Sequence, residues 1–185
     1  MNLAMMLVCR HSRTSDAAGL EDAVQYGLEA FTEAPKNDLD RALAVRSFSN
    51  ILFHKYLKSG KPSDLDMSIE IGREALSVSS NHLSRHLSRA GCLNDLGNSL
   101  RHRHQNFRTS STDLDEGIKL LRQATDAVPS DHSSQAIHFR NLSKLLMEQY
   151  HESVELVDPK EVVSCYQKAL SVTAAPTNRR IHAAE

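Results

Sequence analysis

Apolar residues recur along this chain at helical spacing, in two patterns that alternate. The first pattern ends near an alanine, has a mostly small residue seven positions before it, and meets Pro, Ser or Ala five positions after it. Its four copies place this alanine at Ala30, Ala75, Ala124 and Ala169, at intervals of 45, 49 and 45 residues. Small residues on one face followed by a stop signal predict a recurring helix, here called helix B.

The second pattern lies between the copies of the first. It reads SFSNILFHKY, CLNDLGNSLRHRH and FRNLSKLLMEQY, with Ile51, Leu96 and Leu142 in one slot. The opening residues MNLAMMLVCRH place Leu3 in the same slot. An Asn or Asp precedes the slot every time, and apolar residues three before and four after it form a helical stripe in most copies. The sequence therefore predicts repeated units, each a helix A and an antiparallel helix B joined by a polar loop.

Composition narrows the class of protein. The 185 residues are 40% apolar and 24% charged, and 22 Lys plus Arg balance 23 Asp plus Glu for a net charge of −1. This balance argues against a sequence-independent nucleic-acid binder, which needs a basic excess. No window approaches a membrane span. Three widely separated cysteines without a CxxC motif suggest a reducing compartment, so we expect a cytoplasmic protein.

The combined pattern, large-x2-Leu-small followed by small-x6-Ala-x4-Pro, resembles the tetratricopeptide repeat over nearly the whole chain. The best copy consists of Leu93, Leu96, Gly97 and Leu100, followed by Gly117, Ala124 and Pro129. The usual repeat has about 34 residues, so these units are long. We attribute the excess to the loops KSGKPSDLD and HQNFRTSSTDLDE and to an extra turn or two at the start of helix A. The resemblance implies an all-α solenoid of stacked antiparallel helical hairpins.

The predicted domain organisation is a single repeat region over 1–185, with repeats at roughly 1–34, 35–80, 81–129 and 130–175. Residues 176–185 read as the start of a further, truncated helix. Solenoid ends normally carry polar caps, and neither end shows one. We therefore expect a piece of a longer array or a truncated gene model. The alternative is that the short first helix around Leu3 frays or packs against a second copy of the chain. In the latter case the protein would self-associate through its uncapped ends.

The sequence segments LxxLGNSL, DLDEGIxLxRQA and P.DH resemble those of the long-repeat arrays in fungal multidomain proteins. Those arrays often adjoin a caspase-like CHAT domain or a nucleotide-binding switch domain. The resemblance implies an alternative function, in which this chain is the regulatory arm of a larger protease or nucleotide-switched effector and is inactive alone.

Histidines and basic residues supply the first candidates for chemistry. His82 and His86 stand at i, i+4, but HLSRH lacks the Glu of HExxH and has no evident third ligand, so solvent-facing histidines are favoured. The densest basic run, from Arg101 through Arg108, falls at the end of a helix A. There cations complement the helix dipole, and we favour that interpretation over a phosphate or nucleic-acid patch.

Acidic residues and cysteines give no catalytic site. The pairs Asp64 with Asp66 and Asp113 with Asp115 recur where helix B begins, which indicates capping and dipole complementation. Cys92 and Cys165 fall within apolar patterns and behave as small hydrophobes. Cys9 beside Arg10 and His11 has no oxyanion hole near it in sequence. The sequon at Asn141 lies in mid-helix and is attributed to coincidence.

What remains is a binding surface. Helices A usually line the concave side of such arrays, so residues off their apolar stripe are the predicted contacts with a protein or peptide ligand. These residues are Asn50, Phe53, His54, Asn94, Asn98, Arg101, Lys144 and Met147. The competing interpretations are an ordinary solvated helix face and a contact with the rest of a longer protein. The sequence therefore predicts a non-enzymatic scaffold or adaptor with no cofactor and no metal, and an intrinsic metal- or cysteine-dependent enzyme ranks far below it.

Overall fold

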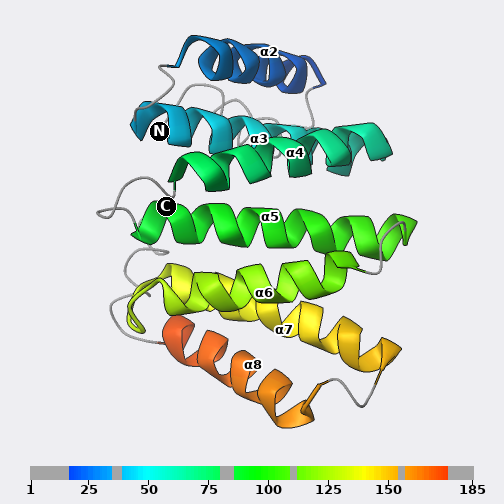
Figure 1. Cartoon of the computed structure of the whole chain (residues 1–185), viewed down its shortest axis with the longest axis vertical. Helices are drawn as coiled ribbons and strands as arrows, with labels where there is room; N and C mark the ends of the chain where they lie inside the picture. Colours follow the sequence, from blue (N-terminus) through cyan, green and yellow to red (C-terminus); the bar gives the residue numbers. More distant parts are fainter. Residues whose placement is uncertain (1–16, 35–38, 80–85, 109–111, 154–156, 175–185) are drawn as a thin grey trace. The chain divides into compact units, whose positions relative to one another are not determined.

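A computed structural model describes residues 17–34, 39–79, 86–108, 112–153 and 157–174, and its regular elements there are all α-helices (Figure 1). They are α2 (Ala17–Glu33), α3 (Leu39–Ser59), α4 (Pro62–Ser79), α5 (His86–Phe107), α6 (Thr112–Asp126), α7 (Ser134–Glu152) and α8 (Pro159–Ala174). The predicted first helix around Leu3 and the predicted start of a helix at 176–185 lie outside the described residues.

The two sequence patterns correspond to two kinds of helix, as predicted. Helices α3, α5 and α7 carry the helix A pattern, and α2, α4, α6 and α8 carry the helix B pattern. The helices A have 21, 22 and 19 residues, and the helices B have 15 to 18.

The predicted polar loops are mostly helical, which corrects the sequence interpretation. Only 60–61 separate α3 from α4, and only 108–111 separate α5 from α6. Pro62 begins α4, a position where the fixed backbone angle of proline is favourable and its missing N–H costs nothing. The extra length of each repeat therefore lies in longer helices and not in long loops.

Left-handed residues end both of these helices A. Gly60 (φ 67°) donates its N–H to the Tyr56 carbonyl at 2.8 Å, and Arg108 (φ 47°) donates to the His104 carbonyl at 3.1 Å. Glycine adopts this conformation without strain, whereas an arginine meets a steric penalty. The turn after α3 thus uses glycine, which favours the left-handed conformation, whereas the turn after α5 uses an arginine in the same conformation.

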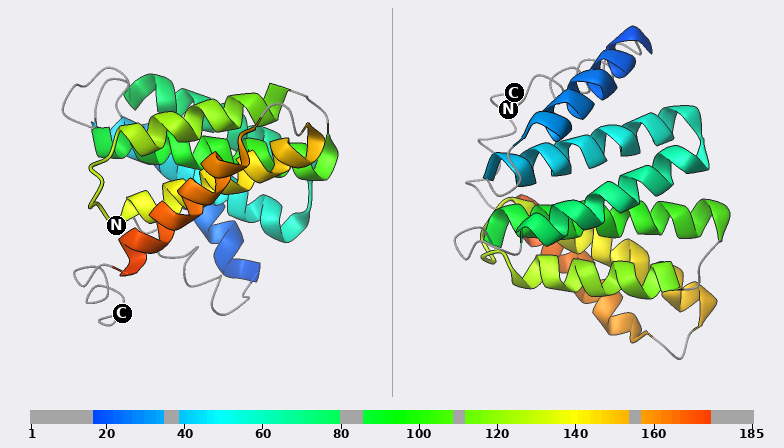
Figure 2. Two further views of the ribbon diagram at one scale, coloured as in Figure 1. Left: turned by 90° about the horizontal axis from the view of Figure 1, so that it is seen from below. Right: turned by 45° about the horizontal axis from the view of Figure 1, so that its top comes forward.

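The chain folds into two compact units, residues 1–88 and 89–185. In the first, α3 packs between α2 and α4, and consecutive helices run in opposite directions (Figure 2). Ser49 and Ser68, both buried, exchange bonds between α3 and α4: each hydroxyl donates to the other residue's carbonyl, at 2.8 and 3.0 Å. Two short side chains that satisfy each other let the helices approach closely.

In the second unit, Asn141 of α7 bonds to Asn94 of α5, and Arg122 of α6 pairs with Glu161 of α8. An apolar core cluster joins α6, α7 and α8 and consists of Leu114, Ile118, Leu121, Leu142, Leu145, Leu146, Val157, Val162 and Cys165. Helix α7 supplies three of the leucines and packs against both α6 and α8. This arrangement leaves the outer side of α5 and α7 for polar chemistry.

Two glycines set the closest approach between α5 and α6. A β-carbon at Gly97 would lie 3.0 Å from Leu121 Cγ and 3.2 Å from the Gly117 carbonyl oxygen. A β-carbon at Gly117 would lie 3.1 Å from Leu145 Cδ2 and 3.4 Å from the Gly97 carbonyl oxygen. The small positions that define the repeat pattern are therefore the points where one backbone meets the next.

An ion pair closes the α5–α6 hairpin. Arg103 donates to both carboxylate oxygens of Asp113, each at 2.7 Å, and the Asp113 side chain is 2% exposed. In the first unit Asp64 takes the same position in helix B, where it accepts from Ser59 at 2.8 Å and pairs with Lys55 at 3.3 Å. These acids do lie in the first helical turn, as predicted, but each also pairs with a cation from the preceding helix A.

We expect Gly97→Ala to lower the free energy of unfolding by about 1 kcal/mol. Alanine gains about 1 kcal/mol of helix propensity, but overpacking against a backbone oxygen costs about 1–3 kcal/mol. Urea denaturation measures the change, with Gln123→Ala at an exposed site on α6 as the control. A stabilised Gly97→Ala protein would contradict the close approach.

We expect Asp113→Asn to cost about 3 kcal/mol of stability, because it breaks an ion pair with Arg103 in which the Asp113 side chain is 2% exposed. The matched control is Glu161→Gln. It breaks a bidentate pair with Arg122 whose side chains are 37% and 52% exposed, and it should cost less than about 0.5 kcal/mol. Equal losses in thermal or urea unfolding would show that burial does not govern these pairs.

Candidate protein-binding surface

Helices α5 and α7 meet along a polar seam, defined by three pairs. Asn141 donates to Asn94 at 3.0 Å, Arg101 pairs with Glu148 at 3.2 Å, and His104 contacts Glu152 at 2.8 Å. The partners are 47, 47 and 48 positions apart, about one repeat. The seam therefore joins equivalent faces of two successive helices A.

Arg101 is the centre of this seam. Its guanidinium also donates to Gln105 at 2.8 Å and to Asn98 at 3.4 Å, and the residue is 8% exposed. It lies 3.0 Å from Nε2 of His102. An arginine can only donate, so that nitrogen must accept and the imidazole must be neutral.

Burial and neighbouring cations both lower pKa values around Arg101. Burial, Arg101 and Lys144 together lower the pKa of His102 to about 4. Burial, Arg101 and Arg140 lower the pKa of Lys144, which Glu148 partly offsets. We call Arg101, His102, Arg140, Lys144 and Glu148 the Arg101 cluster.

Glu148 is the acid within this cluster, and it is not an ideal counter-ion. Burial raises its pKa, and Glu152 adds to that effect, while Arg101 and His104 oppose it. Arg101 Nε and Glu148 Oε2 are buried without a hydrogen-bond partner in the described part of the chain. The cluster therefore holds three cations near one carboxylate whose ionisation is itself disfavoured.

The structure brings some of the predicted contact residues together and separates others. Asn98, Arg101 and Lys144 lie at the Arg101 cluster, Asn98 by its bond to Arg101 and Lys144 by its effect on His102. Asn94 is buried in the seam, and Met147 packs against the apolar core. On α3 of the first unit, Asn50, Phe53 and His54 are half-buried, and the Phe53 ring contacts those of His54 and Tyr56.

Sequence reasoning missed His102 as a site residue, together with Arg140, Asn141 and Glu148. A signal for Asn141 and Glu148 was present, because writing α7 beneath α5 at an offset of 47 residues, one more than separates Leu96 from Leu142, pairs Asn94 with Asn141 and Arg101 with Glu148. The basic run was assigned to the helix dipole as a whole. In the structure Arg101, Arg103 and His104 each have a separate acidic partner.

The remaining candidates have simpler structural roles. Cys92 and Cys165 are buried and form no disulfide, as predicted for small hydrophobes, and burial raises the pKa of the Cys165 thiol. Asn141 of the sequon is 8% exposed within α7. Cys9 and His82 lie outside the described residues. Among the residues described, no group could hold a metal ion, and no helix has the length and apolarity to cross a membrane.

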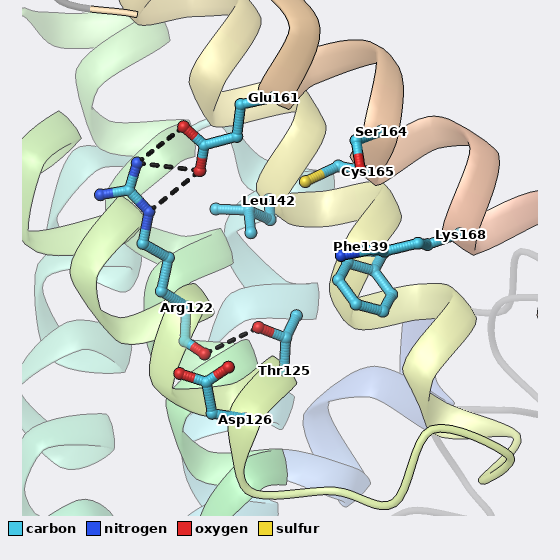
Figure 3. A pocket seen from close by; sticks show the side chains of 9 residues that line it. All are labelled: Arg122, Thr125, Asp126, Phe139, Leu142, Glu161, Ser164, Cys165 and Lys168. Carbon is cyan, nitrogen blue, oxygen red and sulfur yellow. Dashed lines mark hydrogen bonds and ion pairs between the residues drawn. The ribbon is translucent and has the colours of Figure 1, made fainter. Parts of the chain in front are cut away.

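A groove of about 310 Å³ lies between α6 and α8, over the first half of α7 (Figure 3). Its cations are already engaged. Arg122 donates to both oxygens of Glu161, at 2.9 and 3.0 Å, and Lys168 Nζ lies 5.1 Å from the centre of the Phe139 ring. The groove thus offers a ligand less unbalanced charge than the Arg101 cluster does.

Titration of His102 tests the joint effect of burial and of the neighbouring cations on its pKa. We expect its NMR midpoint near pH 4 and expect Lys144→Gln to raise it, because one of the charges that disfavour the imidazolium is removed. The unfolded chain protonates near pH 6.5, so this histidine should also lower stability as pH falls from 6.5 toward 4. Lys119→Gln, an exposed change on α6, is the control. Equal midpoints in the wild type and in Lys144→Gln would rule out the contribution of the Lys144 charge.

Comparison with known proteins gives a fold. No protein-family model matches this sequence, and no curated protein matches it significantly. Solved structures that resemble it include two of a Podosopora anserina protein provisionally named a kinesin light chain, with nearly identical TPR-like repeats. One of them, a variant with a single substitution, has a TM-score of 0.66 and 14% identity, over 95% of this chain and 78% of that one. The other has a TM-score of 0.58 and 12% identity, over 96% and 87%. This chain therefore has the all-α, tetratricopeptide-like helical-repeat fold that its sequence predicts.

Proposed function

We propose that this chain is a non-enzymatic protein-interaction module, which binds an acidic segment of a partner protein at the Arg101 cluster. The observation that carries the proposal is the position of Lys144 beside both Arg101 and Arg140, whose charges add to burial in lowering the pKa of Lys144. A carboxylate placed among these cations would relieve their mutual repulsion.

Accessibility supports the proposal. Lys144 and Arg140 are exposed, so a ligand can reach them without displacing the pair of buried Arg101 with half-buried Glu148. Both lie on α7, four positions apart, which places them on one helical face. Two neighbouring cations above a buried third suit an extended segment with two or more Asp or Glu residues, or a C-terminal carboxylate.

Hydrogen-bonding groups beside the cations supply the remaining contacts. Asn98 is half-buried next to Arg101, and an amide can both donate to and accept from a peptide backbone. Gln105 is exposed on the same helix and bonds to Arg101 and Glu148. A peptide held here would receive charge pairing from α7 and polar contacts from α5.

The buried thiols favour binding over catalysis. A nucleophilic cysteine needs a lowered pKa and access to substrate, whereas Cys165 has a raised pKa and is 5% exposed. A cytoplasmic location, membership of a longer array and a neighbouring CHAT or nucleotide-switch domain stay predictions from the sequence. Each is compatible with a binding arm of this kind.

Charge reversal at the exposed cations tests the proposal. We expect Lys144→Glu with Arg140→Glu to weaken binding of labelled Asp- and Glu-rich peptides at least about ten-fold in fluorescence anisotropy, the factor for ~1.4 kcal/mol. Loss of two ion pairs supplies this difference, and added salt should weaken wild-type binding in the same direction.

The matched control carries the same change of charge elsewhere in the second unit, as Lys119→Glu with Lys160→Glu at exposed sites on α6 and α8. Peptides with Asn and Gln in place of the acids provide the second control. Equal binding of acidic and amide peptides, or equal weakening by both double variants, would overturn the proposal.

A further inference from the structure

Arginine–carboxylate pairs in the second unit have two different geometries. Arg103 donates to both oxygens of Asp113, each at 2.7 Å, and Arg122 likewise holds both oxygens of its acid, at 2.9 and 3.0 Å. Arg101 donates to only one oxygen of Glu148, at 3.2 Å. Because a guanidinium and a carboxylate fit each other through two parallel hydrogen bonds, the Arg101–Glu148 pair is incomplete.

Each member of this pair has an atom left over. Arg101 Nε and Glu148 Oε2 are buried, and neither has a hydrogen-bond partner among the described residues. The other oxygen of Glu148 is shared, since Gln105 also donates to it, at 2.5 Å. A buried donor without an acceptor costs free energy, so Arg101 would gain from a carboxylate that reached Nε as well.

Glu148 is poorly held in its place. Burial raises its pKa, and the neighbouring Glu152 adds to that effect. Its side chain is 20% exposed, so it lies at the edge of the seam and can turn toward water without disturbing the core. Rehydration of the carboxylate would offset the loss of one hydrogen bond to Arg101.

The position of Glu148 along α7 relates it to the exposed cations of the Arg101 cluster. Arg140, Lys144 and Glu148 follow one another at four-residue intervals and so share one face of the helix. Four helical residues advance about 6 Å, close to the ~6.6 Å between alternate residues of an extended peptide. A segment with one acid at Lys144 therefore places an acid two positions away beside Glu148, over Arg101.

We propose that Glu148 is an internal competitor of the acidic ligand. In the free protein its carboxylate occupies Arg101; in the complex an acid of the ligand accepts from Nε and one Nη of Arg101, and Glu148 turns toward water. This inference rests on the proposed function. It adds that the site selects segments with acids at alternate positions, because a single acid held by Lys144 and Arg140 leaves Glu148 in place.

Glu148→Gln tests the proposal, because it keeps the size and the acceptor oxygen of the side chain but removes the competing charge. We expect it to strengthen binding of labelled peptides with Asp or Glu at alternate positions about ten-fold in fluorescence anisotropy, the factor for ~1.4 kcal/mol. The matched control is Glu152→Gln, which removes the same charge one turn further along α7. The Glu152 side chain is 41% exposed and contacts His104, so this change should alter binding less than about two-fold.

The gain should also depend on Arg101. Adding Arg101→Gln to Glu148→Gln should abolish the gain, because the released guanidinium is then absent, and it leaves both members of the pair neutral. Lys119→Gln in the same background removes one positive charge at an exposed site on α6 and should retain the gain. Circular dichroism and urea unfolding verify that each variant is folded.

The outcomes separate this proposal from the proposed function. If the wild type prefers acidic to amide peptides but Glu148→Gln gives no gain, the internal competitor is wrong and acidic-segment binding stands. An equal gain in Glu152→Gln, or a gain that survives Arg101→Gln, would overturn it in favour of a general effect of net charge. If the wild type binds acidic and amide peptides equally, the proposed function fails and this inference fails with it.

Discussion

The contact between Gly97 and Gly117 is the constraint on which the second unit depends. Each helix presents a residue without a side chain where the other's backbone arrives, so α5 and α6 approach more closely than larger residues permit. Leu145 of α7 fills the space beside Gly117. The three helices are therefore fixed by one small-residue contact and one leucine. Ser49 and Ser68 make the corresponding contact between α3 and α4, with hydroxyls that bond to the opposite backbone.

Once α6 is fixed between α5 and α7 on the core side, the polar edges of α5 and α7 meet along the seam. Charges in such a place lose hydration and must be paired, because an unpaired buried charge is costly. Arg101 has Glu148, and Arg103 turns instead to Asp113 across the hairpin. Lys144 and Arg140 lie on the exposed side, outside these two pairs. The positive charge there thus follows from the same packing that pairs Arg101 and Arg103 with acids.

Much of the fold was predictable because apolar periodicity and small positions are local signals. The alanine, Gly117 and Leu96 all lie within single helices, so their spacing gave the order and kind of every described helix. The loops were harder, since polar residues such as those of 58–66 do not distinguish a helix end from a turn. At the candidate site, Asn98, Arg101 and Lys144 were predictable as contact residues because their spacing places them off the apolar stripe of their helices. The pairing of Arg101 with Glu148 depends on the register between two helices, which a reading of one helix at a time does not contain.

Binding at the Arg101 cluster depends on charge and weakens as salt screens it. Helix α7 carries Arg140 and Lys144 of the cluster, while its leucines lie in a close-packed core. A ligand held by these two cations therefore need not disturb the core contacts of the same helix. Added salt should thus weaken capture of acidic peptides by the wild-type protein while the apolar core, which salts of the sulfate type strengthen, stays intact.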